Sequence, residues 1–178
     1  MRPGKNILTK HPYQCMRPAR RKARISRRNF AHEQFAREKF LRAANEFGRL
    51  GHTGDLEMVI RTMARQSITH PQLPRAYQIA GNACLTLARN FGRQARARKR
   101  GPIRQELETK RRRTLKRAKE HFLQGAWVAE RNAVRSENEF ERTRDLVEKG
   151  LAGHFRALEA MLKKAAEKAE KLRATDGI

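Results

Sequence analysis

The chain has 178 residues, and its 42 Lys and Arg against 18 Asp and Glu give a formal net charge of +24. Such an excess of cations predicts a polyanionic partner. No apolar run approaches the roughly 20 residues that are needed to cross a bilayer, so we do not expect an integral membrane protein. Two cysteines, Cys15 and Cys84, are too few for a disulfide framework, so we expect a reducing, cytoplasmic location. An organellar matrix is the alternative, because transit peptides share the arginine-rich, acid-free start of this chain.

The charge is concentrated in two segments. Residues 1–30 carry ten basic and no acidic side chains, and residues 89–119 carry fourteen basic and two acidic ones. Arginine outnumbers lysine by 29 to 13 in the whole chain. A planar guanidinium binds phosphate through two hydrogen bonds, whereas an ammonium acts as a point charge. The two segments therefore predict binding to phosphate groups.

Residues 1–28 are expected to form a basic, extended arm that a partner orders. Pro3, Pro12 and Pro18 interrupt any helix there, and the segment has little apolar content before Ile25. Tyr13 is the one aromatic residue of the arm that is well placed to stack on a base, and simple loop packing is its alternative role.

From Asn29 onward, apolar side chains recur at spacings of three and four, as they do on amphipathic helices. The first predicted helix ends at the glycines that follow residue 47, and its apolar stripe is Ala36, Phe40, Ala43, Phe47 and Leu50. The second starts from Asp55 as N-cap and stops at His70-Pro71. Its apolar face is Leu56, Val59, Ile60 and Met63.

A third helix is predicted from Pro74 to about Arg100, before the clearest break in the chain at Gly101-Pro102. Its apolar stripe is Tyr77, Ala80, Cys84, Leu87 and Phe91. The pattern continues after the break through Leu115, Ala118, Phe122, Ala126 and Ala129. Ser136-x-x-Glu139 has the pattern of a capping box and predicts the start of a last helix there. Its inward face would be Phe140, Val147, Leu151, Phe155, Leu158 and Leu162.

No segment shows the alternation of a strand. We therefore predict an all-α fold of about five amphipathic helices in a small bundle, with a long C-terminal helical hairpin and a basic, extended N-terminal arm. Residues 29–178 would form a single helical domain, made of a three-helix part over residues 29–100 and the hairpin over residues 101–178.

Arginines follow a line of their own on the third predicted helix. Arg89, Arg93, Arg96 and Arg100 step by four, three and four, and the first two lie about 200° from Phe91 on the helical wheel. We interpret this line as a phosphate-binding face, with an ordinary solvated face as the alternative. A second patch follows the break, although that polar stretch could also stay unfolded without its partner. The candidate nucleic-acid-binding residues are Arg20, Arg21, Lys22, Arg24, Arg27, Arg28, Arg89, Arg93, Arg96, Arg98, Lys99, Arg100, Arg104, Lys110, Arg111, Arg112, Arg113, Lys116, Arg117 and Lys119.

Patterns typical of enzymes are weak. Asp occurs only three times, and the spacing of His11 and Cys15 has no second pair to complete a zinc site. No P-loop or dinucleotide fingerprint is present. We expect no catalytic residue, no metal, no cofactor and no small-molecule substrate.

The sequence thus predicts a non-enzymatic, nucleic-acid-binding structural or assembly subunit of a ribonucleoprotein complex, with RNA favoured over DNA and with other protein subunits as partners. The alternative is a DNA-binding accessory or regulatory protein of a nucleoid, plasmid-transfer or phage system. Residues 70–73 could be the turn of a helix-turn-helix for this role, but the Pro-rich linker and the apolar start of the next helix count against that motif. A polybasic membrane-surface protein fits least well, because the basic faces lack interleaved apolar anchors.

Overall fold

The computed structural model describes residues 30–67 and 69–175, and this part of the chain folds into five helices without a strand, as the sequence predicts. The helices are α2 (Phe30–Leu50), α3 (Thr53–Gln66), α4 (Leu73–Arg96), α5 (Pro102–Thr143) and α6 (Leu146–Ala174). The predicted arm, residues 1–28, lies outside the described residues. Among the helices described, none combines the length and the apolarity that a membrane span requires.

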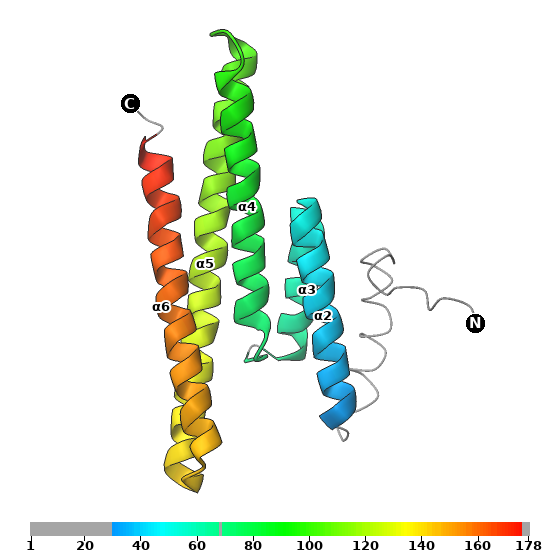
Figure 1. Ribbon diagram of the computed structural model, residues 1–178, viewed down its shortest axis with the longest axis vertical. Helices are drawn as coiled ribbons and strands as arrows, with labels where there is room; N and C mark the ends of the chain where they lie inside the picture. Colours follow the sequence, from blue (N-terminus) through cyan, green and yellow to red (C-terminus); the bar gives the residue numbers. More distant parts are fainter. Residues whose placement is uncertain (1–29, 68, 176–178) are drawn as a thin grey trace, which may run out of the picture.

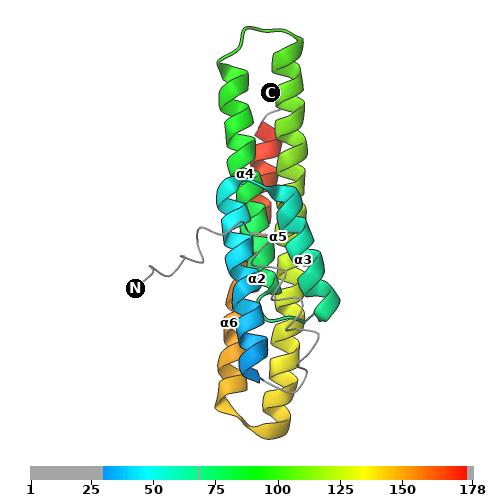
Figure 2. The same ribbon diagram turned by 90° about the vertical axis from the view of Figure 1, so that its right-hand side faces the viewer.

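Three long helices form the body of the molecule (Figure 1). α5 runs antiparallel to α4 on one side and to α6 on the other, so α5 and α6 make the predicted long C-terminal hairpin. The shorter α2 and α3 form a second hairpin that covers α4 on the side away from α6 (Figures 1 and 2).

Two clusters of buried side chains hold these helices together, and α4 contributes to both. The first joins α2, α3 and α4 with Val128 of α5. Its members from the first three helices are Phe40, Ala43, Ala44, Phe47, Leu56, Val59, Ile60, Met63, Leu73, Ala76, Ala80 and Ala83. The second joins α4, α5 and α6 through Cys84, Ala118, Phe122, Ala126, Ala129, Leu158, Leu162, Ala166 and Ala169. The predicted apolar faces around Phe40, Leu56 and Phe122 are therefore confirmed as core.

The last helix starts later than the capping-box pattern predicts. Ser136 is buried inside α5, and Glu139 pairs with Arg142 at 2.6 Å instead of capping a helix. α5 ends at Thr143, and its C-cap Arg144 has a left-handed φ of 58° that stops the helix. Asp145 is the real N-cap of α6, because its Oδ1 accepts a hydrogen bond from the backbone N–H of Val147 at 2.9 Å.

This shift changes the predicted inward face of the last helix. Val147 and Leu151 are 66% and 40% exposed, so their predicted burial is wrong. Phe155, Leu158 and Leu162 are buried, as predicted. These three side chains face α5, whereas the first turn of α6 lies beside the loop that joins α5 to α6.

Two other predicted helix ends are also wrong. α3 begins at Thr53 and has His52 as its N-cap, so Asp55 lies in the first turn and pairs with His52 Nδ1 at 3.3 Å. α4 ends at Arg96 and not near Arg100. Leu50, the last residue of the first predicted stripe, is 46% exposed, so its predicted burial is also wrong.

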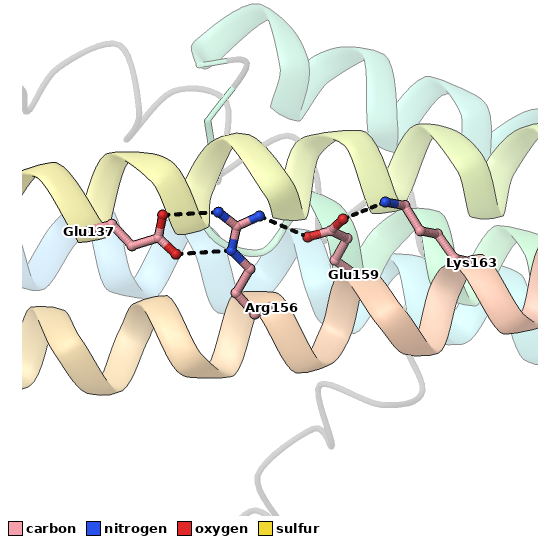
Figure 3. Close-up of polar contacts among 4 residues, drawn as sticks. All are labelled: Glu137, Arg156, Glu159 and Lys163. Carbon is pink, nitrogen blue, oxygen red and sulfur yellow. Dashed lines mark hydrogen bonds and ion pairs between the residues drawn. The ribbon is translucent and has the colours of Figure 1, made fainter.

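An ion-pair chain fastens α5 to α6 (Figure 3). Arg156 of α6 donates from Nε and Nη2 to the two carboxylate oxygens of Glu137 on α5, each at 2.9 Å, and from Nη1 to Glu159 at 3.3 Å. Lys163 completes the chain on Glu159. The hydrogen bond from Arg156 lowers the pKa of Glu137, and the one from Lys163 is the main cause that lowers the pKa of Glu159.

Candidate nucleic-acid interface

In the part of the chain that the structure describes, one end of the molecule consists of α4 and α5. Both helices extend past the ends of α3 and α6, and residues 97–101 join them at the tip (Figures 1 and 2). Lys119 of α5 pairs with Glu170 near the end of α6 at 3.3 Å, and the first buried residue of α5 is Leu115. The stretch from residue 102 to 114 spans about 20 Å at 1.5 Å per residue and buries none of its side chains fully.

This projecting end coincides with the second basic segment, and we call residues 89–119 the basic hairpin. The predicted binding residues on it are mostly exposed: Arg89, Arg93, Arg96, Arg98, Lys99, Arg100, Lys110, Arg112, Arg113, Lys116 and Arg117. Three are half-buried, namely Arg104, Arg111 and Lys119. The polar stretch after the Gly101-Pro102 break, which could have stayed unfolded, is helical throughout as the first part of α5.

Carboxylates neutralise only some of these cations. Arg104 pairs with Glu108 at 2.9 Å, Lys110 with Glu106 at 2.6 Å and Lys116 with Glu120 at 4.0 Å. Eight cations of the basic hairpin have no ion-pair partner within the part of the chain that the structure describes. They are Arg89, Arg93, Arg96, Arg98, Lys99, Arg100, Arg113 and Arg117. Their charge is available to an external anion.

Arg111 has a structural position within the basic hairpin. Its guanidinium lies against Gly92 of α4, where an added Cβ would stand 3.1 Å from Arg111 Nε. The absence of a side chain at Gly92 lets the half-buried Arg111 pack across α4. Arg111 therefore helps to join the two helices as well as adding positive charge.

A hollow opens between α4 and α5 on one side of the basic hairpin. Its lining is Phe91 of α4 with Lys110, Arg113, Thr114, Lys116, Arg117 and Glu120 of α5. The predicted arginine line of α4 does not border it, because Arg89 and Arg93 lie about 200° from Phe91 around the helix axis. Cations thus surround the hairpin, with the α4 arginines on one face and the hollow on another.

The hollow contains residues that sequence reasoning missed. The stripe pattern predicts Phe91 as core, yet Phe91 is half-buried and borders the hollow, and Leu87 is also half-buried. The buried positions of α4 in this region are the small residues Ala88, Gly92 and Ala95. Arg89 and Arg93 lie on the opposite side of the helix from Phe91, so their exposure favoured burial of Phe91 and gave no signal that it lies at the edge of the core.

Burial shifts the pKa of two titratable side chains of α4 and α5, Cys84 and His121. Burial raises the pKa of the Cys84 thiol to about 11, so the thiol is protonated at neutral pH. Burial likewise lowers the pKa of His121, whose ring lies 6.3 Å from that of Tyr77 between centroids. Among the described residues, no group of three or more His, Cys, Asp or Glu side chains is arranged to hold a metal ion.

The other predicted site residues lie outside the described residues. They are the arm cations Arg20, Arg21, Lys22, Arg24, Arg27 and Arg28 and the stacking candidate Tyr13. Their roles stay predictions.

In comparisons with known proteins, no family model, no curated protein and no solved structure matches this chain.

Proposed function

We propose that this protein is a non-enzymatic, nucleic-acid-binding subunit of a ribonucleoprotein complex, which binds the phosphate backbone of RNA through the basic hairpin and the arginines of its arm. The observation that carries the proposal is the set of eight exposed cations without ion-pair partners on a projecting pair of helices. Fourteen basic side chains within residues 89–119 repel one another, and a phosphate backbone relieves that repulsion while releasing its own condensed counterions.

The geometry of the hairpin supports a role in binding more than a role in folding. Exposed charges contribute little to stability, and the stretch from residue 102 to 114 adds no fully buried side chain to the core. Two helices instead carry the cations along a projection that reaches up to about 20 Å beyond the rest of the bundle. Such a projection can reach along a groove or between segments of a folded RNA.

Two features favour RNA over duplex DNA. The hollow pairs an aromatic ring with cations, and unstacked bases that can meet such a ring are more common in folded RNA. A helix-turn-helix built from α3 and α4 would need the start of α4 to be free to enter a major groove. That start is buried instead, since Leu73, Pro74 and Ala76 pack into the first core cluster or beside it.

Apolar side chains on the outside of α5 support contacts with other protein subunits. Leu123, Trp127 and Val134 are exposed and share one face of the helix, because they are spaced by four and seven residues. The guanidinium of Arg131 lies 4.1 Å from the centre of the Trp127 ring on the same face. An aromatic and arginine pair of this kind is typical of the anchors of protein interfaces.

A competition experiment tests the proposal. The protein is freed of nucleic acid by nuclease and high salt, bound to a labelled structured RNA, and challenged with unlabelled RNA or DNA of the same sequence, single-stranded or duplex. We expect RNA to displace the label at several-fold lower concentration than duplex DNA. Tighter binding of duplex DNA would favour the DNA-binding alternative, and no binding to either would overturn the proposal.

A further inference from the structure

The hollow beside Phe91 differs in chemistry from the rest of the basic hairpin. The described lining of the hollow combines four cations with one aromatic ring and one carboxylate. Of these cations, Arg113 and Arg117 have no ion-pair partner among the described residues. The hollow therefore has cations of α5 on one side and the apolar ring of Phe91 on the other.

We propose that this hollow binds one nucleotide of a single strand, with the base stacked on Phe91 and its flanking phosphates on Arg113 and Arg117. The inference rests on the proposed function and narrows it, because it names the part of the nucleic acid that the hollow takes. A nucleotide is the unit that brings a flat π face and a phosphate together, and aromatic rings beside cationic grooves bind single strands in this way.

The spacing on α5 fits this division of roles. Lys110, Arg113 and Arg117 step by three and four, so they lie on one side of the helix over about 10 Å. A strand that follows this row keeps its phosphates on α5, and its bases turn toward Phe91 on α4. A duplex can place only phosphates on the row, because its bases remain stacked on each other.

Glu120 gives a second reason for a base in the hollow. A carboxylate repels a phosphate, but it accepts hydrogen bonds from the amino groups on base edges. Lys116, at 4.0 Å, offsets part of the negative charge of Glu120. A hollow built only for phosphates would have no use for the carboxylate or for the ring.

The position of Phe91 leaves its ring available. Phe91 is half-buried and belongs to neither cluster of core residues, although Cys84 on the same helix is a core member. Helix packing at its level is supplied by Gly92 against Arg111. A change at Phe91 that keeps apolar volume should therefore leave the helices in place.

The test compares Phe91→Leu with the matched variant Phe140→Leu. Phe140 also has cations over its ring, with Arg144 at 5.9 Å and Lys149 at 5.8 Å, but it lies near the end of α5 that is away from the basic hairpin. Binding is measured to an unstructured 12-nucleotide RNA and to a 12-base-pair RNA duplex. For Phe91→Leu we expect at least about fivefold weaker single-strand binding, with duplex binding and the salt dependence unchanged. Phe140→Leu should bind both probes as the wild type does.

Single-strand binding by Phe91→Leu within twofold of wild type, or an equal loss on the duplex, would overturn the inference. If the wild type binds neither probe, the proposed function fails instead, so the two failures are distinguishable.

A fluorescent variant gives a second readout. Phe91→Trp is placed in a Trp127→Phe background, so that the only tryptophan lies in the hollow. Stacking should quench its fluorescence as the single strand saturates the protein and should leave it unchanged with the duplex. Saturable single-strand binding without quenching would contradict the stacking geometry.

Discussion

Gly81 of α4 lies directly against the ring of Phe122 on α5, where an added Cβ would come within 2.5 Å of the ring. Gly92 meets Arg111 in the same manner further along the pair. Eleven residues separate the two glycines on α4, and eleven separate their partners on α5, so the helices run antiparallel without a slip. This register places Phe91 beside the cations of α5 and so determines which residues line the hollow in the basic hairpin.

Gly81→Ala should destabilise the protein by roughly 1 to 3 kcal/mol, because the new methyl group must displace a buried ring from a packed core. Urea unfolding followed by circular dichroism measures the change. Gly153→Ala is the control, since none of the described residues lies within 4 Å of a Cβ at this position in α6. It should stabilise the protein by up to about 1 kcal/mol through helix propensity. Equal stability of the two variants would show that the close approach at Gly81 is absent.

The fold was largely predictable because hydrophobic periodicity and the Gly101-Pro102 break are strong local signals. The start of α6 was not, since two helix-start patterns lie within ten residues. Ser136 with Glu139 and Asp145 with Glu148 both resemble a capping box. Tertiary packing decides between them, because Ser136 faces the core and only Asp145 reaches a free backbone N–H.

Asp145→Ala should therefore cost about 1 kcal/mol, the usual effect of losing an N-cap hydrogen bond. Ser136→Ala should cost less, since alanine is a better helix former inside α5. Thermal unfolding of both variants in one buffer makes the comparison. A larger loss for Ser136→Ala would support the helix start that the sequence pattern predicts.

The ion pair between Arg156 and Glu137 should make stability depend on pH. Its hydrogen bonds lower the pKa of Glu137 from the ordinary 4.5, so the stabilisation is fully present above pH 4.5 and is lost as the pH falls through the lowered value. Arg156→Gln should melt at a lower temperature than wild type at pH 7, and the difference should shrink as the pH falls below 4.5. Arg142→Gln, whose partner Glu139 lies on the same helix, should show a smaller difference at pH 7. A constant difference for Arg156→Gln from pH 7 to 3 would contradict this account.

The candidate site was predictable in charge but not in shape. Charge density and the spacing of Arg89, Arg93 and Arg96 are properties of the sequence, and the structure places all three on the surface. The hollow depends on which residues of α5 meet α4, and only the register between the helices determines that. Phe91 followed the apolar stripe, so the sequence offered burial as its simplest interpretation.

The α4 arginines should serve binding rather than folding. Arg93→Glu with Arg96→Glu reverses four units of local charge at exposed positions that have no ion-pair partner in the described chain. We expect RNA binding to weaken at least about tenfold at low salt, with the melting temperature nearly unchanged. Leu162→Ala is the converse control, because its buried side chain should cost roughly 2 to 5 kcal/mol. Loss of the fold in the double Glu variant, with unchanged binding by its soluble remainder, would assign the arginines to structure.

The most direct test of the central claim is the slope of log affinity against log salt concentration for the wild-type protein on an unstructured single-stranded RNA. If the unpaired cations of the basic hairpin contact phosphates, each contact releases condensed counterions and the slope should be about −3 or steeper, equivalent to at least about four phosphates. The double Glu variant should give a visibly shallower slope. A flat slope for the wild type would contradict binding through the phosphate backbone.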